Sequence, residues 1–179
     1  MNMDIDEKTL QETMLYKGRI ISLYCDDVLL PNGDTAKREY VTHRGGAAIL
    51  PVDEEGNVYL VRQFRYPYRE EILEIPAGKL EEGEEFYSTA VRELEEETGM
   101  KAGKMTSLGI LYPSPGYTNE HLYVYLATEL GKGRIHLDED EFVNTVKMPY
   151  REAYEMVMDN RIKDAKTCYA ILRYAQMIH

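Results

Sequence analysis

The sequence predicts a mixed α/β (α+β) fold, and three observations predict it. Short apolar runs with strand-like alternation, separated by turn signals, fill most of the first 75 residues. A segment that ends at Gly99 carries an apolar stripe with helical spacing, and two further helical patterns follow Pro149. Strands combined with helices in this way favour a sandwich of helices on a mixed sheet.

The N-terminal part reads as a β-hairpin region over residues 1–45. Residues 9–14, 18–30 and 37–42 look extended, and residues 31–34 (Pro-Asn-Gly-Asp) form a turn signal between two of these runs. Little of this region is periodic enough to form a core alone, so we expect it to pack on another body, such as a second subunit. Residues 46–179 are expected to form one larger domain.

The larger domain should begin with strands and continue through one central helix. Residues 47–52 and 58–61 read as buried strands around a turn at 54–57, and residues 71–75 alternate acidic and apolar side chains like another strand. Gly83 and the acidic residues after it open a helix of about 14 residues. Its apolar stripe is expected to be Tyr87, Ala90, Val91 and Leu94. Further strands are expected near 106–112, 121–127 and 142–148, and helices near 150–158 and 164–178.

The composition excludes several classes of protein. The formal net charge is -11, whereas duplex nucleic-acid binders owe their affinity to basic residues that neutralise phosphates. The start is acidic, unlike a secretory leader, and no apolar run approaches the roughly 20 residues that span a bilayer. Cys25 and Cys168 lie far apart and are expected to be reduced. These features favour a cytoplasmic protein without a membrane or nucleic-acid partner.

The acidic residues are concentrated in one segment. Eleven glutamates lie between Glu70 and Glu97, with only Lys79 and Arg92 as basic residues among them. Glu93, Glu96 and Glu97 have i, i+3 and i+4 spacing, so they share one side of the helix although like charges at this spacing destabilise it. A solvated acidic helix would be the simpler interpretation. Bound divalent cations explain the cluster better, because hard carboxylate oxygens suit Mg²⁺ or Mn²⁺.

Residues 78–100 read GKLEEGEEFYSTAVRELEEETGM and resemble the signature of the Nudix hydrolase family, G-x5-E-x7-R-E-U-x-E-E-x-G-U. Every defined position matches: Gly78, Glu84, Arg92, Glu93, Leu94, Glu96, Glu97, Gly99 and Met100. The resemblance implies an α/β/α sandwich with a mixed sheet in residues 46–179 and hydrolysis of a phosphoanhydride bond.

The resemblance also implies a metal site. Glu93 and Glu97 are expected to be the principal ligands and to serve catalysis directly, with Glu96 and the backbone carbonyl of Ala77 beside them. The cofactor is expected to be Mg²⁺, with Mn²⁺ possible. Arg92 is expected to hold the carboxylates of the signature in place, with direct substrate contact as the alternative.

The segments around the signature resemble the ADP-ribose pyrophosphatase subfamily. Pro115 lies sixteen residues after Gly99, which is the mark of that subfamily, although a plain Pro-Gly turn is the alternative. The resemblance places Pro115 and Tyr117 among the expected substrate-binding residues. Tyr117 or Tyr112 could stack on a base or ribose, or simply pack.

Two arginines and one glutamate extend this resemblance to the substrate. Arg65 lies in a stretch that resembles the Q-x-R motif, and Arg44 stands where dimeric members use an arginine near the nucleotide. A guanidinium suits a diphosphate because it can pair with two oxygens at once, although either side chain could be an ordinary surface arginine. Glu74 begins an E-x-P-A-G approach to the signature and is expected near the metals or the substrate.

Residues 138–141 (Asp-Glu-Asp-Glu) resemble the acidic loop that supplies a general base in this subfamily. Glu139 is the expected base and Glu141 an expected metal ligand. The two roles could be exchanged, and a solvated acidic turn is the alternative.

The resemblance therefore implies Mg²⁺-dependent hydrolysis of ADP-ribose to AMP and ribose 5-phosphate by a homodimer. The alternatives are another nucleoside diphosphate derivative as substrate, such as a sugar nucleotide or a dinucleoside polyphosphate, and a non-catalytic ADP-ribose sensor.

Overall fold

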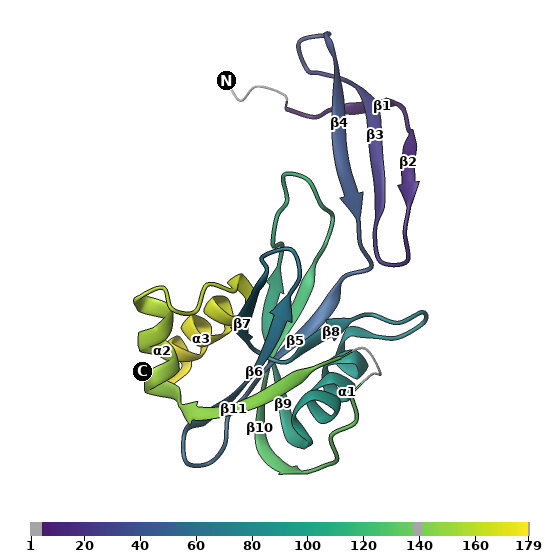
Figure 1. Cartoon of the computed structure of the whole chain (residues 1–179). Helices are drawn as coiled ribbons and strands as arrows, with labels where there is room; N and C mark the ends of the chain where they lie inside the picture. Colours follow the sequence, from purple (N-terminus) through teal and green to yellow (C-terminus); the bar gives the residue numbers. More distant parts are fainter. Residues whose placement is uncertain (1–4, 138–140, 179) are drawn as a thin grey trace. The chain divides into compact units, whose positions relative to one another are not determined.

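The computed structural model describes residues 5–137 and 141–178 of the chain (Figure 1). The chain divides into two compact units, which are described separately below. The first comprises Met1–Gly45 and Ser114–Glu120, and the second comprises Gly46–Pro113 and His121–His179.

The first unit is a four-stranded antiparallel sheet built around β3. Its strands are β1 (Lys8–Gln11), β2 (Met14–Lys17), β3 (Ser22–Leu29) and β4 (Thr35–Thr42), and β3 pairs with each of the others. The single strand expected over residues 9–14 is interrupted, because the N–H of Thr13 donates to the Asp26 carboxylate at 3.0 Å instead of continuing the ladder. Every residue of β1 and β2 is exposed.

The second unit contains two sheets and three helices. One sheet has the order β8-β5-β10-β9, in which β5 and β10 are parallel and the other pairs are antiparallel, and the second has the order β11-β6-β7. The strands are β5 (Gly46–Pro51), β6 (Asn57–Arg65), β7 (Glu70–Glu74), β8 (Ala77–Lys79), β9 (Met100–Leu111), β10 (Leu122–Lys132) and β11 (Val143–Pro149). The helices are α1 (Phe86–Thr98), α2 (Tyr150–Met158) and α3 (Ala165–Ile178).

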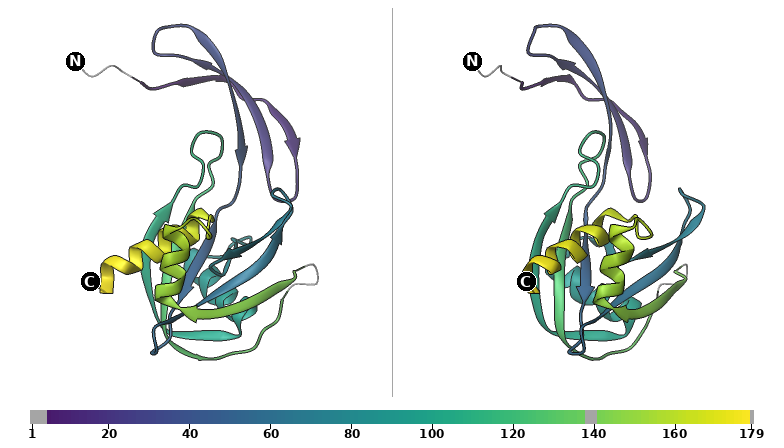
Figure 2. Two further views of the ribbon diagram at one scale, coloured as in Figure 1. Left: turned by 60° about the vertical axis from the view of Figure 1, so that its left-hand side comes forward. Right: turned by 90° about the vertical axis from the view of Figure 1, so that its left-hand side faces the viewer.

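Strand β5 lies at the centre of the second unit and is buried on both faces, which explains its continuous apolar run. On one face, Ala47 and Ile49 pack with Ala90 and Leu94 of α1. On the other face, Ala48 and Leu50 join the larger core cluster, to which α2 and α3 contribute Ala153, Ala170 and Ile171. The right-hand view of Figure 2 has α2 and α3 in front of the sheet and α1 behind it. The expected α/β/α arrangement with a mixed sheet is confirmed.

The structure corrects the expected apolar stripe of α1. Ala90 and Leu94 are fully buried, but Tyr87 and Val91 are 54% and 40% exposed. The carboxylates of Glu93 and Glu97 are buried instead, at 6% and 4% exposure. The helix is therefore rotated toward its acidic residues, which hydropathy alone assigns to solvent.

The boundaries differ from expectation at three places. The helix begins at Phe86 rather than directly after Gly83, and β9 begins at Met100, immediately after α1 ends. The three-residue strand β8 was not expected, because it is too short to show a period. No helix in the described part of the chain is long and apolar enough to cross a membrane.

Candidate active site

The C-terminal half of α1 carries the acidic residues of the site. Glu93 and Glu97 point into the second unit and are buried, whereas Glu96 stays partly exposed. The helix ends at Gly99, which has a φ of 67° and lets its N–H bond back to the carbonyl of Glu95. The signature thus places two glutamates one turn apart against the sheet.

The backbone of β8 passes directly against these two carboxylates. The N–H of Ala77 donates to Oε2 of Glu97 at 2.9 Å. A Cβ at position 78 would overlap the carboxylate of Glu93, so any residue other than glycine would displace that side chain. Three of the expected ligand residues, Ala77, Glu93 and Glu97, are therefore brought together by the fold.

Arg92 connects three acidic side chains of the signature. Its Nη1 donates to Glu93 and to Glu96, each at 2.8 Å. Its Nε and Nη2 donate to the two oxygens of Glu84, both at 3.0 Å. The hydrogen bonds from Arg92 lower the pKa of Glu84 to about 2. Arg92 therefore ties the loop before α1 to the helix face that carries the carboxylates.

The two buried glutamates hold their charge unfavourably. Burial raises the pKa of Glu93 to about 7, and the neighbouring charges of Glu96 and Glu141 act in the same direction although Arg92 opposes them. Burial also raises the pKa of Glu97 to about 8, again with contributions from Glu93 and Glu141. Glu141 is itself exposed. The acidic groups thus lie close enough to repel one another, and Arg92 does not compensate them fully.

The donor chemistry of this group fits a hard divalent cation. Carboxylate oxygens and a backbone carbonyl are the ligands that Mg²⁺ prefers, and a cation would relieve the repulsion among the buried glutamates. As the side chains are arranged in residues 5–137 and 141–178, no group of three or more acidic, histidine or cysteine residues is gathered closely enough to hold an ion. Glu93 and Glu96 are instead turned toward Arg92.

The raised pKa values predict how the stability of the metal-free protein depends on pH. When folding raises the pKa of a carboxyl above its unfolded value of 4.5, the group stabilises the folded state fully at a pH below 4.5. This stabilisation is lost as the pH rises through the folded-state pKa. In a chelator, the melting temperature should therefore fall between about pH 4.5 and about pH 8. The Glu97→Gln variant should show a smaller fall in differential scanning calorimetry. Superimposable curves for the two proteins would contradict this account.

Arg65 and Glu74 form a second charged group, at the ends of β6 and β7. Glu74 is fully buried and accepts two hydrogen bonds from Arg65, at 2.6 Å from Nε and at 2.8 Å from Nη2. Burial by itself would raise the pKa of Glu74, but Arg65 and Lys166 outweigh it and the pKa is lowered. Glu74 is thus a buried anion that holds the guanidinium of Arg65.

A third contribution, which the sequence patterns did not predict, comes from the start of α3. Lys166 is buried and contacts both Glu74 and Asp164. Thr167 accepts the N–H of Ile75 at 2.8 Å. A lysine in an amphipathic helix normally reads as solvated, so only a fold that brings α3 to β7 reveals this group.

The remaining expected residues are placed as follows. Arg44, Pro115 and Tyr117 belong to the first unit, and all three are exposed. Residues 114–118 form a turn in which the N–H of Tyr117 bonds to the carbonyl of Ser114, so the plain turn is present at Pro115. Glu139 lies outside the described residues.

Comparison with known proteins identifies the family. The NUDIX domain family matches residues 42–168, and the family described as nucleoside diphosphate sugar hydrolase N-terminal domain matches residues 7–41. An ADP-ribose pyrophosphatase of Bacillus subtilis is 47% identical over 97% of this chain and 94% of its own length. A methanol dehydrogenase activator of Bacillus methanolicus is 42% identical over 96% and 94%. A GDP-mannose pyrophosphatase of Yersinia pestis is 35% identical over 98% and 94%.

A solved structure supports the same fold. A crystal structure of an ADP compounds hydrolase superposes with a TM-score of 0.88 over 99% of this chain and 96% of the other, at 22% sequence identity. The match spans both units, and the complete signature sits on α1 with its glutamates turned inward. The chain belongs to the Nudix hydrolase family.

Proposed function

We propose that this protein hydrolyses the pyrophosphate bond of ADP-ribose to AMP and ribose 5-phosphate in an Mg²⁺-dependent reaction. The observation that carries the proposal is the pair of buried, mutually repelling carboxylates, Glu93 and Glu97, pressed against the backbone of β8. Such a pair is costly unless a cation and an anionic substrate complete it. The relatives named as ADP-ribose pyrophosphatases, at 47% and 35% identity, support the choice of substrate.

The chain offers a set of oxygen ligands for the cofactor. Glu93, Glu96, Glu97, Glu141 and the Ala77 carbonyl would hold Mg²⁺, or Mn²⁺ in its place. When bound, the ion would neutralise the diphosphate and lower the pKa of a water molecule.

The protein's own residues would position the reactants. Arg65 has N–H donors left over after pairing with Glu74, and these would bind a phosphate of the substrate. Glu139 would accept the proton of a water molecule whose oxygen attacks one phosphorus, with Glu141 as the alternative base. A new P–O bond forms, the anhydride P–O bond breaks, and the two phosphomonoesters leave. Arg44, Pro115 and Tyr117 keep their expected substrate-binding roles as part of the proposal.

The experiment is a substrate panel with Mg²⁺ and identification of the products. ADP-ribose should be hydrolysed with the highest kcat/KM, releasing AMP and ribose 5-phosphate. Removing the metal with a chelator should abolish the reaction. Tight binding of ADP-ribose without Mg²⁺-dependent hydrolysis would instead favour a sensor.

GDP-mannose is the second candidate substrate, because the Yersinia pestis relative carries that name and matches almost the whole chain. The diphosphate chemistry proposed above is common to both compounds, so residues outside the signature must discriminate between them. A higher kcat/KM for GDP-mannose in the same panel would replace ADP-ribose in the proposal.

We also propose that the protein is a cytoplasmic homodimer that pairs through residues 1–45. Apolar side chains exposed on β1 and β2, among them Leu10, Met14, Leu15 and Tyr16, support a covering partner. Sedimentation of the intact chain should give the dimer mass, and a fully active monomer would contradict this.

A further inference from the structure

A charged group surrounds the carboxylate of Glu74, and two of its members at the start of α3, Lys166 and Asp164, have no role in the mechanism above. It contains two cations, Arg65 and Lys166, and two carboxylates, Glu74 and Asp164. Lys166 is 8% exposed, and a buried lysine is retained only at a cost in desolvation. Replacing a buried ionic cluster by apolar side chains of similar volume is often neutral or stabilising, so stability alone is a weak reason for such a cluster. Its position beside the proposed phosphate-binding arginine therefore calls for another explanation.

The geometry of Arg65 shows what the group could do. The guanidinium has five N–H donors, and Glu74 takes one from Nε and one from Nη2. The side chain is still 39% exposed. One edge of the guanidinium is therefore fixed by the protein, while the donors of Nη1 take no part in this pairing.

Lys166 contacts the carboxylate of Glu74, which in turn holds the guanidinium of Arg65. Its Nζ contacts Oε2 of Glu74, the same oxygen that accepts from Nη2 of Arg65, and it also bonds to Asp164 at 2.9 Å. Asp164 in turn accepts from the backbone N–H and the hydroxyl of Thr167, at 3.0 Å and 2.5 Å. The hydroxyl oxygen of Thr167 accepts the N–H of Ile75, the residue after Glu74. The start of α3 thus holds both the side chain and the backbone at the end of β7.

The charges of the group balance, and this balance matters for an anionic substrate. Two cations and two carboxylates sum to zero, so within this group no excess of negative charge opposes a phosphate at Arg65. Without Lys166 the group would carry a net charge of about -1, which would repel a diphosphate and draw Arg65 toward Glu74.

We propose that Lys166 is a positioning residue for substrate binding: through Glu74 it holds Arg65 in place and cancels the charge that would oppose the diphosphate. The inference rests on the proposed function, since it needs Arg65 to bind a substrate phosphate. It goes beyond that function by assigning a binding role to a buried residue of α3.

The test is the Lys166→Met variant, which keeps the approximate volume and removes the charge. The KM for ADP-ribose should rise roughly tenfold, equivalent to about 1.4 kcal/mol, while kcat changes little. Isothermal titration of ADP-ribose in a chelator should show a similar loss of affinity without turnover. Lys166→Arg keeps the charge and should restore part of the affinity.

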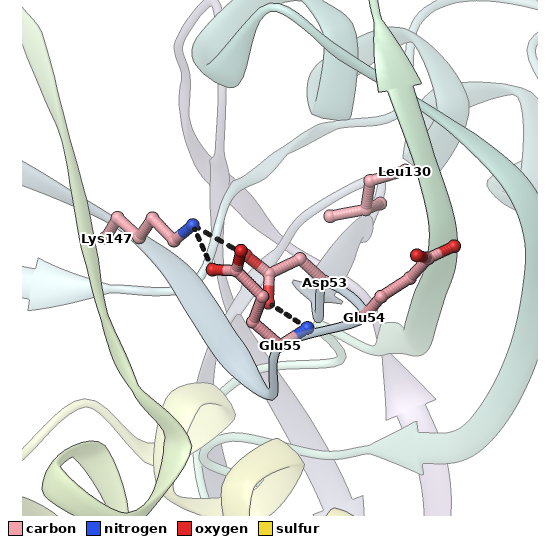
Figure 3. A pocket seen from close by; sticks show the side chains of 5 residues that line it. All are labelled: Asp53, Glu54, Glu55, Leu130 and Lys147. Carbon is pink, nitrogen blue, oxygen red and sulfur yellow. Dashed lines mark hydrogen bonds and ion pairs between the residues drawn. The ribbon is translucent and has the colours of Figure 1, made fainter.

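The matched control is Lys147→Met. Lys147 also bridges two carboxylates, Asp53 at 2.8 Å and Glu55 at 3.3 Å (Figure 3). Lys147 lies on β11, where it pairs with Tyr59 of β6. Tyr59 is six residues from Arg65 along β6, which corresponds to roughly 20 Å of strand. This variant should keep the wild-type KM.

A double-mutant cycle separates positioning from a general structural effect. If Lys166 acts through Arg65, Lys166→Met should change KM little in an Arg65→Ala background. An equal rise of KM in both backgrounds would overturn the inference, and so would an unchanged KM when Arg65 is present. A Lys166→Met variant that melts at a lower temperature but keeps the wild-type KM would also overturn it.

If the wild type hydrolyses GDP-mannose instead, the choice of ADP-ribose fails and the same cycle decides the inference with that substrate. If it hydrolyses neither compound, both fail.

Discussion

Replacing Glu97 by glutamine is expected to lower kcat for ADP-ribose by roughly 10²–10³-fold at saturating Mg²⁺, the scale of removing a group that stabilises charge in the transition state. Glutamine keeps an oxygen that can accept the N–H of Ala77, so the contact with β8 should survive. It also removes a carboxylate whose charged form is disfavoured by burial, so the metal-free variant should melt no lower than the wild type. Steady-state kinetics and calorimetry measure both effects.

Glu95→Gln is the control for this prediction. Glu95 lies on the same helix but occupies an undefined position of the signature, where it contacts Lys101 at 3.3 Å and the backbone N–H of Arg134. Its variant should keep near wild-type turnover. A Glu97→Gln enzyme that is almost as fast as the wild type would refute the metal-ligand assignment.

The residues of α1 could be predicted from the sequence because their relation is local. The spacing of Glu93, Glu96 and Glu97 fixes their common side on any α-helix, and Gly99 marks the end of that helix. The match to the family signature then selected Glu93 and Glu97 as the principal metal ligands, and these two are buried. Hydropathy was right for Ala90 and Leu94 but wrong in placing Tyr87 and Val91 on the buried face, because it treats every carboxylate as solvated.

The group around Glu74 could not be predicted because its contacts are long-range. Lys166 and Glu74 are 92 residues apart in sequence, and no periodicity connects β7 with α3. The same reason applies to β8 as a strand, because its three residues pair with β5, far earlier in the chain. Sequence patterns therefore predicted which residue types the site contains, while packing determined how the supporting side chains hold them.

Replacing Arg92 by methionine should have the second large effect. The variant leaves Glu84, Glu93 and Glu96 without the guanidinium that they share. We expect kcat/KM to fall roughly 10- to 100-fold, as when a group that orients metal ligands is lost. The metal-free protein should lose about 2 kcal/mol of unfolding free energy, because charged hydrogen bonds are removed and the carboxylates repel. Urea denaturation with and without Mg²⁺ measures this loss.

The response to Mg²⁺ distinguishes this role from ordinary surface pairing. Added Mg²⁺ should stabilise the Arg92→Met variant more than it stabilises the wild type, since the ion would compensate the charges that the arginine no longer holds. Arg151→Met is the control: Arg151 is 90% exposed and pairs with Glu155 along α2, so its loss should change neither kcat/KM nor the response to Mg²⁺. Arg92→Lys keeps the charge but not the planar fork, and it should lie between the two. Equal Mg²⁺ responses in wild type and Arg92→Met would show that Arg92 does not organise the carboxylates for the cation.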